Sequence, residues 1–383
     1  MSKTVLRVVH LSFSLDPGRR DGETLLREWP TLVNVATAVA RAGVDVTVVQ
    51  ASHRRETVYR NGIPFHFVDD DRGTPLRLPF GLRWQRQPTN VFDAVAAAAP
   101  AVVHVHGFHY PLVIRRLARR LRGVPILLQD HKTHPMSWPR RVVWRWTSRR
   151  LAGVAVTGRG QATALIDAGM LRRTIQVFDI LEGSTPFTIG DREEARRRTG
   201  ISGTPAFLWT GHLNANKDPL TVLDAFAAAA PRLPDARLWC CFAQAPLLED
   251  VRRRIAADPR LQHRVTLLGF RPYGEMEHYF RAADFFVQIS GFEGSGYSVI
   301  EALACGATPL VSDIAPFRRI VGDAGSLTPV GDAPALADAM IAWAERDCAA
   351  LRQAARRRFD EELSFERIGL DLRAAYERLV DRR

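Results

Sequence analysis

Short apolar blocks alternate with segments of helical spacing along the first half of the chain. Residues 5–12 (VLRVVHLS) have the pattern of a buried strand, residues 30–43 that of a helix, and residues 44–52 that of the next strand. The alternation continues with strands over 100–107, 124–131 and 151–158 and a helix over 111–123. A strand, a helix and a strand at this spacing predict a parallel sheet.

The alternation breaks off in a polar stretch near residues 185–190 and then restarts. The second half has strands over 206–213, 236–243, 264–270, 284–290 and 307–313, helices beginning at Pro219 and Pro334, and a helix ending at Gly306. We therefore expect an α/β protein with domains over 1–187 and 188–360 and a C-terminal amphipathic helix over 361–383 that returns to the first domain. Ligands of open parallel sheets bind beyond the carboxyl ends of the strands, which predicts a site between the domains.

The net charge of the chain is unevenly distributed. Of the formal +12, residues 1–190 carry +13 and the remainder −1, and residues 110–153 hold eleven cations against Asp130 alone. The predicted helix over 111–123 contributes five of these cations, namely Arg115, Arg116, Arg119, Arg120 and Arg122. Such a patch has an anionic partner, and we expect an anionic membrane surface beside a lipid-linked acceptor. Nucleic acid is not expected, because the patch lacks a recognisable nucleic-acid motif.

Composition places the chain among ordinary globular proteins. Its 383 residues are 46% hydrophobic and 25% charged. No run of about 18 uncharged apolar residues, the length of a membrane-spanning helix, occurs in the sequence. The N-terminal apolar run lacks a small-residue cleavage site, and the four cysteines are spaced for neither disulfides nor zinc. We expect a cytoplasmic protein that the basic patch can hold at the inner face of the membrane.

A glycine-rich turn between a strand and a helix is the strongest candidate site. The strand over 284–290 is followed by Gly291, Gly294 and Gly296, and a short helix is predicted over 297–305. Glycines here let backbone N–H groups approach an anion, and the helix N-terminus adds partial positive charge. The segment is therefore expected to bind phosphate groups.

Two carboxylates flank the start of this helix, Glu293 in the turn and Glu301 one turn into the helix, in the pattern E-x7-E. The surrounding GFEGSGYSVIEALACG, with YFRAADFFVQIS before it and PLVSDIAPFRRIVGDAGSLTPVGDAPALADAM after it, resembles the family 4 retaining glycosyltransferases of the GT-B fold. The resemblance implies two Rossmann-like domains facing each other across a cleft, with the acceptor on the first domain and a nucleotide sugar on the second.

Two further segments are similar to this family. LWTGHLNANKDPLTVLDAF resembles the G-R-L-x-x-x-K motif, with Lys217 at the lysine position and His212 where an arginine is usual. A histidine is mostly neutral at pH 7, and charge gained beside phosphates would make donor affinity rise as the pH falls from about 8 towards 6. In the first domain, His131 matches the histidine that lines the cleft near the transferred sugar, whereas the usual Gly-Gly loop is replaced by SLDPGRRDGE.

The resemblance implies a role for each matching residue. Glu301 would bind the nucleotide ribose, Glu293 the sugar hydroxyls and Lys217 with His212 the diphosphate, while backbone groups of Gly296, Tyr297 and Ser298 add donors and His131 acts with Glu293 at the reacting centre. It implies a hexosyltransferase that retains the anomeric configuration, uses a nucleotide diphosphate sugar and a glycan, lipid-linked or small-molecule acceptor, and needs no metal or other cofactor. The alternatives are a GT-B sugar-nucleotide epimerase and a non-catalytic sugar- or membrane-binding protein.

Three structural or metal-binding interpretations compete with these roles. Ser298 and Glu301 also form the capping-box pattern S-x-x-E, which would make Glu301 structural. The acids over 69–71 contain a D-x-D, the metal-binding pattern of a different glycosyltransferase fold. The five histidines His104, His106, His109, His131 and His134 could be imagined as a metal cluster, but no Cys or carboxylate completes a ligand set at usual spacing. We favour the nucleotide-sugar site without metal.

Overall fold

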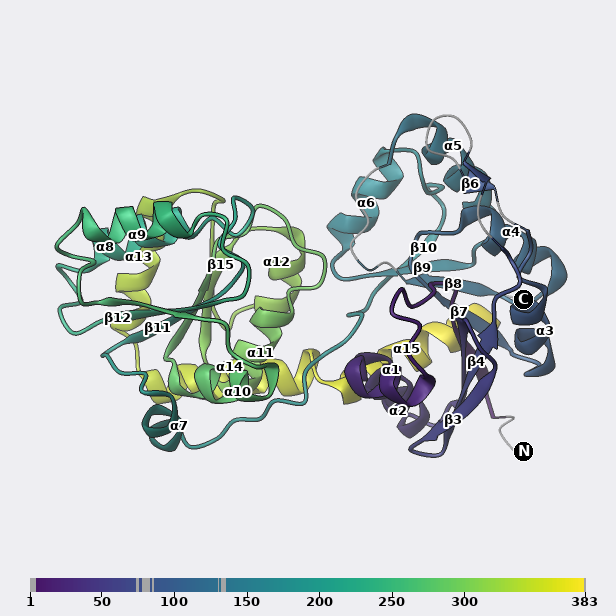
Figure 1. Ribbon diagram of the computed structural model, residues 1–383, viewed down its shortest axis with the longest axis horizontal. Coiled ribbons are helices and arrows are strands. Elements are labelled where there is room, and N and C mark those ends of the chain that lie inside the picture. Colours follow the sequence, from purple (N-terminus) through teal and green to yellow (C-terminus); the bar gives the residue numbers. More distant parts are fainter. Residues whose placement is uncertain are drawn as a thin grey trace. The chain divides into compact units, whose positions relative to one another are not determined.

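The computed structural model describes residues 5–73, 76, 77, 83, 84, 86–129, 131 and 136–381. They form two compact units, one of residues 1–183 with 365–383 and the other of residues 184–364. Each unit has its own parallel sheet covered by helices (Figure 1). Two Rossmann-like sheets confirm the predicted α/β class.

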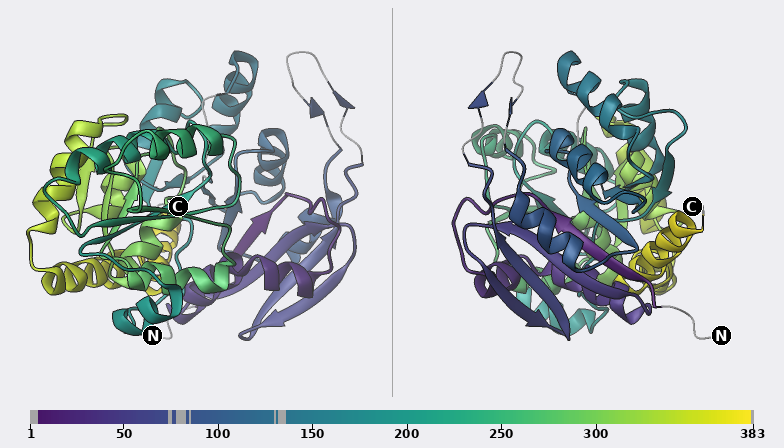
Figure 2. Two further views of the ribbon diagram at one scale, coloured as in Figure 1. Left: turned by 60° about the vertical axis from the view of Figure 1, so that its left-hand side comes forward. Right: turned by 90° about the vertical axis from the view of Figure 1, so that its right-hand side faces the viewer.

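The first unit is built on an eight-stranded sheet of order β10-β9-β8-β7-β1-β2-β4-β3. Its strands are β1 (Arg7–Ser12), β2 (Asp45–Ser52), β3 (Glu56–Arg60), β4 (Ile63–Asp69), β7 (Val102–His106), β8 (Ile126–Gln129), β9 (Gly153–Val156) and β10 (Gln176–Asp179). Only β3, at one edge, is antiparallel to its neighbour. The short strands β5 (Leu76–Arg77) and β6 (Arg83–Trp84) pair separately and stand apart from the large sheet (Figure 2).

The central strands of this sheet carry histidines among apolar residues. In the parallel register of β1 and β7, His10 lies opposite His104 and Ser12 opposite His106. Because side chains alternate along a strand, His104 and His106 share a face of the sheet. Three imidazoles are thus brought together beside the carboxyl ends of β1 and β7, where ligands of parallel sheets bind.

Seven helices of the described first unit pack around this sheet. They are α1 (Gly22–Glu28), α2 (Pro30–Arg41), α3 (Thr89–Ala97), α4 (Pro111–Arg120), α5 (Trp138–Ser148), α6 (Arg159–Asp167) and α15 (Phe365–Val380). The C-terminal helix α15 lies alongside α2 (Figure 1). The approach is close at Gly369, where an added Cβ would come within 2.4 Å of the Ala38 carbonyl oxygen. This contact lets α15 present Tyr376, fully buried, to the sheet.

The second unit has a six-stranded, wholly parallel sheet of order β13-β12-β11-β14-β15-β16. Its strands are β11 (Ala206–Gly211), β12 (Arg237–Phe242), β13 (Val265–Gly269), β14 (Phe285–Gln288), β15 (Thr308–Ser312) and β16 (Ser326–Thr328). Its helices are α7 (Arg192–Thr199), α8 (Pro219–Ala229), α9 (Leu248–Ala256), α10 (Tyr273–Ala282), α11 (Tyr297–Cys305), α12 (Ala315–Val321), α13 (Ala333–Ala344) and α14 (Cys348–Glu362). The strand order reverses beside β11 and β14, which brings the loops after these two strands together.

Candidate active site

The glycine-rich turn leads into α11 at Tyr297, the residue at which the sequence predicts the helix to begin. The N-cap residue of α11 is Gly296, which has a φ of +66°. Gly296 lies so close to α12 that an added Cβ would be 2.7 Å from the side chain of Ile320. No side chain caps the helix at this residue, and Ser298 lies inside the helix. The capping-box interpretation of Ser298 and Glu301 is therefore wrong.

Substitution of Gly296 by alanine is expected to destabilise the protein by about 1–3 kcal/mol, because a side chain there meets both a left-handed backbone and the apolar face of α12. Gly274→Ala is a matched control, because a Cβ at Gly274 meets nothing within 4 Å. Urea unfolding of both variants measures the difference. Equal stability of the two variants would contradict the packing described for Gly296.

Lys217 and Glu293 meet in this part of the second unit. The Lys217 Nζ lies 2.5 Å from Glu293 Oε1, and the two side chains are only 17% and 11% exposed. Gln288, at the end of β14, donates from Nε2 to the same carboxylate oxygen at 3.1 Å. A largely buried ammonium is held here by one carboxylate, so its charge lies at the strand ends where an anionic ligand would bind.

Asn216 joins the two loops that carry these charges, and the sequence analysis missed it. Its Nδ2 donates to the Phe292 carbonyl at 3.0 Å, and its Oδ1 accepts from the Phe292 N–H at 3.0 Å. Its own carbonyl accepts from the Gly291 N–H at 2.9 Å. One side chain thus fixes the turn of Glu293 against the loop of Lys217. The available signal was an asparagine one residue before the candidate lysine, in a loop that follows a buried strand.

Glu301 is a buried carboxylate, 8% exposed, on the first turns of α11. Burial raises its pKa to about 7, and the hydroxyl of Tyr273 opposes this rise by hydrogen bonding to the carboxylate. Burial and the nearby charge of Glu301 in turn raise the pKa of Tyr273 to about 12. A buried carboxylate that titrates near neutral pH is typical of a ligand-binding position.

His212 is placed as a neutral hydrogen-bonding group. Its Nδ1 accepts from the backbone N–H of Gln244 at 3.3 Å, so the neutral ring carries its proton on Nε2. The Nε2–H is thereby left as a donor for a phosphate oxygen.

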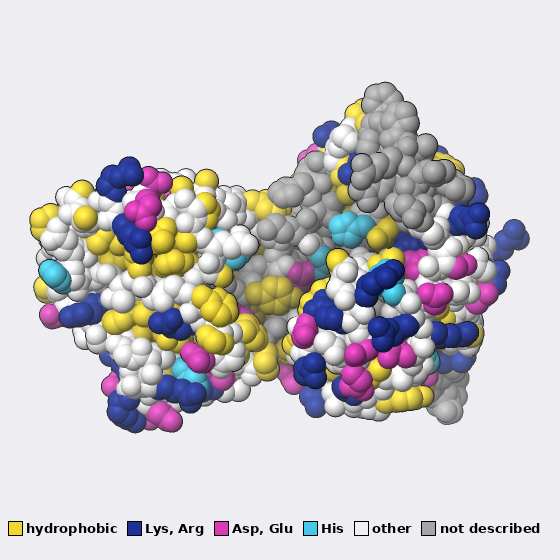
Figure 3. Space-filling model, viewed as in Figure 1, with side chains coloured by type: hydrophobic (Ala, Val, Ile, Leu, Met, Phe, Trp, Pro, Cys, Tyr) yellow, Lys and Arg dark blue, Asp and Glu magenta, His cyan; other side chains and the backbone are white. Residues whose placement is uncertain are grey.

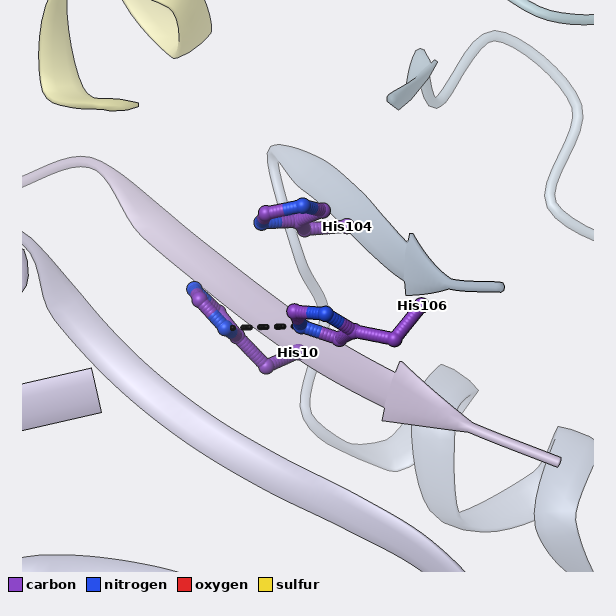
Figure 4. A group of neighbouring side chains, drawn as sticks. All are labelled: His10, His104 and His106. Carbon is purple, nitrogen blue, oxygen red and sulfur yellow. Dashed lines mark hydrogen bonds between the residues drawn. The ribbon is translucent and has the colours of Figure 1, made fainter. Parts of the chain in front are cut away.

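In the first unit, His131 lies at the end of a series of hydrogen-bonded rings. Its Nδ1 contacts Glu182 Oε2, and its Nε2 lies 3.1 Å from His106 Nδ1. The other nitrogen of His106, Nε2, lies 3.2 Å from His10 Nδ1 (Figure 4). Glu182 and His10 were missed by the sequence analysis. The available signal for Glu182 was the apolar alternation over 175–181, which was not identified as a strand and ends directly before this carboxylate.

The proposed metal clusters take a different form in the structure. Nitrogens of His10, His104 and His106 lie within 4.8 Å of one another, but those of His10 and His106 are joined by the hydrogen bond above, which needs a proton between them. In the acidic run over 69–71, Asp70 forms a buried ion pair with Arg72, with Arg72 Nε 2.7 Å from Asp70 Oδ2. His134 lies outside the described residues.

The basic patch is smaller than its sequence suggests. Arg115 is 7% exposed, donates to the Trp146 carbonyl at 2.8 Å and stacks on the Trp146 ring at 3.4 Å, so its assignment to an exposed surface is wrong. Burial, then the charges of neighbouring arginines, lower its pKa. Arg120 pairs with Asp93 at 2.5 Å, whereas Arg119 and Arg122 are exposed. On the face shown in Figure 3, cations of the first unit are interspersed with acids.

Helix α5 exposes an apolar stripe next to these cations. Trp138, Val142 and Trp146 are 75%, 51% and 42% exposed, and their spacing of four residues places them on one face. The tryptophan between them, Trp144, is buried in the core. Arg145 and Arg149 on the same helix and its C-cap are exposed. Exposed tryptophans beside arginines are typical of a surface that contacts the headgroup region of a membrane.

Two largely parallel sheets define an α/β protein. In the second unit a lysine, a helix N-terminus and carboxylates gather at the strand ends, where ligands of such sheets bind. Residues 191–359 match the family model described as "Glycosyl transferases group 1", and residues 29–178 match the "Glycosyl transferase 4-like domain". The chain belongs to the group 1 (family 4) glycosyltransferases, and it is a hexosyltransferase with a GT-B type of fold.

Individual relatives agree with this assignment. The GDP-mannose:cellobiosyl-diphosphopolyprenol alpha-mannosyltransferase of Xanthomonas oryzae pv. oryzae is 26% identical over 330 residues, which cover 84% of this chain and 82% of the relative. A glycosyltransferase structure from Rickettsia africae matches with a TM-score of 0.70 at 13% identity. The match covers 100% of this chain and 100% of that structure. The Anabaena protein Alr3699/HepE, in complex with UDP and glucose, has a TM-score of 0.64 at 16% identity over 97% of this chain and 100% of its own. The two structural matches show a shared fold.

Proposed function

We propose that this enzyme transfers a hexosyl residue, with retention of configuration, from a nucleotide diphosphate sugar bound by the second unit to a lipid-linked acceptor at the first unit. The observation that carries the proposal is the Lys217–Glu293 pair at 2.5 Å beside the N-terminus of α11. The name of the Xanthomonas relative supports GDP-mannose as donor and a diphosphopolyprenol-linked acceptor.

In this proposal the donor displaces the carboxylate from the ammonium. Lys217, the Nε2–H of His212 and backbone groups at Gly296, Tyr297 and Ser298 bind the diphosphate. We call this set of donors the phosphate clamp. Glu293 then turns to the sugar hydroxyls. Negative charge grows on the diphosphate as the glycosidic bond breaks, so donors fixed around it stabilise the transition state more than the ground state.

Two groups outside the phosphate clamp complete the proposed roles. Glu301 accepts hydrogen bonds from the ribose hydroxyls, for which its buried carboxylate is suited. His131, held by Glu182, contacts the transferred sugar from the first unit. The lysine and the helix dipole provide the positive charge that a metal would otherwise supply, so we expect transfer to proceed without a metal.

A donor panel tests this function. The full chain is incubated with GDP-mannose, UDP-glucose or ADP-glucose, a diphosphopolyprenol-linked disaccharide and EDTA. Acceptor-dependent release of GDP and an α-linked product are the expected results. Epimerised sugar nucleotide without any acceptor product, or donor binding without nucleotide release, would replace the proposal with an epimerase or a binding protein. Loss of transfer in EDTA that manganese restores would overturn the metal-free clamp.

Peripheral membrane binding is expected to involve α5. Among the described residues no helix has the length and apolarity needed to cross a membrane. We expect Trp138→Ala to weaken binding to anionic vesicles by about tenfold or more, because a large apolar side chain no longer inserts. Salt should weaken binding of the unaltered protein, because it screens the arginines.

Co-sedimentation with vesicles of phosphatidylglycerol and phosphatidylcholine, at low and high salt, measures this binding. Tyr59→Ala removes another exposed aromatic side chain, 65% exposed on β3, and serves as the control. Equal weakening by both substitutions, or equal binding to charged and neutral vesicles, would remove α5 from the proposal.

A further inference from the structure

The hydrogen bonds of His131 do not end at His106 but continue to a helix from the C-terminus of the chain. His10 Nε2 lies 3.0 Å from the Tyr376 hydroxyl, and that hydroxyl lies 2.7 Å from His104 Nδ1. His10, His104 and Tyr376 are fully buried. Six side chains, from Glu182 at one end to His104 at the other, are therefore joined by five consecutive contacts, which we call the histidine chain.

The neutral form of the histidine chain has a single consistent direction. Glu182 accepts from Nδ1–H of His131, whose Nε2 must then accept from Nδ1–H of His106. The same logic makes His10 a donor from Nδ1 and an acceptor at Nε2. The Tyr376 O–H donates to His10, and its oxygen accepts from His104 Nδ1–H. Every N–H and O–H then has an acceptor.

One additional proton reverses the direction of every hydrogen bond between neighbouring side chains of the histidine chain, from His131 to His104. If His131 carries a proton on both nitrogens, its Nε2–H must donate to His106 Nδ1, and each following bond turns round in the same way. The last ring, His104, then carries its proton on Nε2, a buried nitrogen without a hydrogen-bond partner in the neutral form. Gln129, whose Oε1 is also buried without a partner, favours the charged form of His104 and is suited to receive this N–H.

We infer that Glu182, His106, His10 and Tyr376 are positioning residues for His131, acting as one hydrogen-bond chain whose direction reverses when His131 takes up a proton. The inference rests on the proposed role of His131 in transfer. It assigns a function to α15 as well, because Tyr376 connects this C-terminal helix to the ring that contacts the sugar.

The pKa values of the buried side chains favour their neutral forms. Burial lowers the pKa of His10 to about 4 and those of His104 and His106 well below the usual value. The other charges that act on His104 and His106 are those of members of the chain, namely His10, His104 and His131. Burial also raises the pKa of Tyr376 well above its usual range, so its hydroxyl keeps the proton that the chain needs. His10, His104 and His106 are therefore expected to stay neutral within the histidine chain.

Nitrogen-15 NMR of the histidine rings in the full chain tests the inference without any substrate. At pH 8 we expect His10, His106 and His131 in the Nδ1–H form. As the pH is lowered, His106 and His10 should change to the Nε2–H form at the same midpoint at which His131 becomes charged. Rings of His106 and His10 that keep one form while His131 titrates would overturn the inference, whether or not transfer is detected.

Two substitutions test the chain from its opposite ends. Tyr376→Phe leaves the reversed chain with a buried N–H of His10 that lacks an acceptor, and Glu182→Gln removes the anion beside the charged ring. Both are expected to move the titration midpoint of His131, and the corresponding limb of the pH–rate profile, to lower pH by about one unit. Tyr279→Phe, which removes another buried hydroxyl, bonded to Arg271, should leave both unchanged.

Two outcomes would identify a different role for these residues. A lower kcat in Tyr376→Phe with an unchanged pH profile, and the same result in Glu182→Gln, would mean that they only support the fold. One equivalent of zinc in the purified protein, lost in His10→Gln, would mean that the rings bind a metal instead, because a metal needs the lone pairs of both His10 Nδ1 and His106 Nε2.

Discussion

Replacing Lys217 with methionine is expected to lower kcat by about 100- to 1000-fold, the usual cost of removing one fixed donor from a site where negative charge develops. The Lys217 side chain is 17% exposed and its ammonium already lies against Glu293, so little reorganisation is needed when a diphosphate takes the place of the carboxylate. Steady-state transfer with the donor identified in the panel measures the effect. A change in kcat of less than threefold would exclude Lys217 from the clamp.

The same substitution leaves Glu293 buried without its cation, and this cost must be separated from the loss of catalysis. The double variant Lys217→Met, Glu293→Gln carries no unpaired charge and should recover most of the thermal stability while remaining inactive. Arg254→Ala, which breaks ion pairs with Asp224 and Asp258 in the same unit, is the control for a lost cation and should retain normal turnover. Recovery of activity in the double variant would show that the single loss was one of folding.

The sequence predicts the scaffold of this site well, because the scaffold depends on local patterns. The turn of glycines and the start of α11 follow from residues that are adjacent in the chain, and the apolar blocks specify the parallel strands. An available signal for Lys217 was not used. Only Lys3, Lys132 and Lys217 among the 53 basic residues are lysines, so a lysine in the second unit is unusual in itself.

The interactions that complete the site could not be predicted in this way. Asn216 and Phe292 are 76 residues apart, and His10 and Tyr376 are 366 apart, so their hydrogen bonds depend on how the loops and α15 pack. Helical spacing predicts an amphipathic C-terminal helix but does not reveal that the hydroxyl of Tyr376 on this helix meets two histidines. Likewise Arg115 belongs to a run of arginines in sequence, yet the position of Trp146 buries it.

Donor affinity is expected to rise with pH through neutrality, because of Glu301. A carboxyl with a pKa of about 7 is only about one-tenth ionised at pH 6, and the protonated form loses an acceptor that the ribose hydroxyls need. Apparent affinity should therefore fall about tenfold between pH 8 and pH 6. This direction is opposite to that expected from a charge gained by His212. Calorimetric titration with the nucleoside diphosphate over this range measures it, and affinity that rises towards pH 6 would contradict the role of Glu301.

Glu301→Gln separates binding from stability, because the two should change in opposite directions. Loss of the charged acceptor should weaken nucleotide binding at pH 8 by about 10- to 150-fold and abolish its pH dependence. In the free protein the pKa of Glu301 is raised above its ordinary value, so its contribution to stability is fully present below about pH 4.5 and is lost as the pH rises through about 7. At pH 8 the buried charge is a cost that glutamine removes.

The melting temperature of Glu301→Gln should accordingly exceed that of the unaltered protein at pH 8, by about 2–4 °C for each kcal/mol regained, and the difference should vanish towards pH 5. Glu345→Gln, at a carboxylate 64% exposed and paired with Arg232, should change neither melting temperature nor affinity by a comparable amount. A variant that binds nucleotide weakly and is also less stable at pH 8 would indicate that Glu301 supports the fold. Weaker nucleotide binding together with greater stability is the expected result. It would mean that the buried charge of Glu301 costs stability but binds the ribose of the donor.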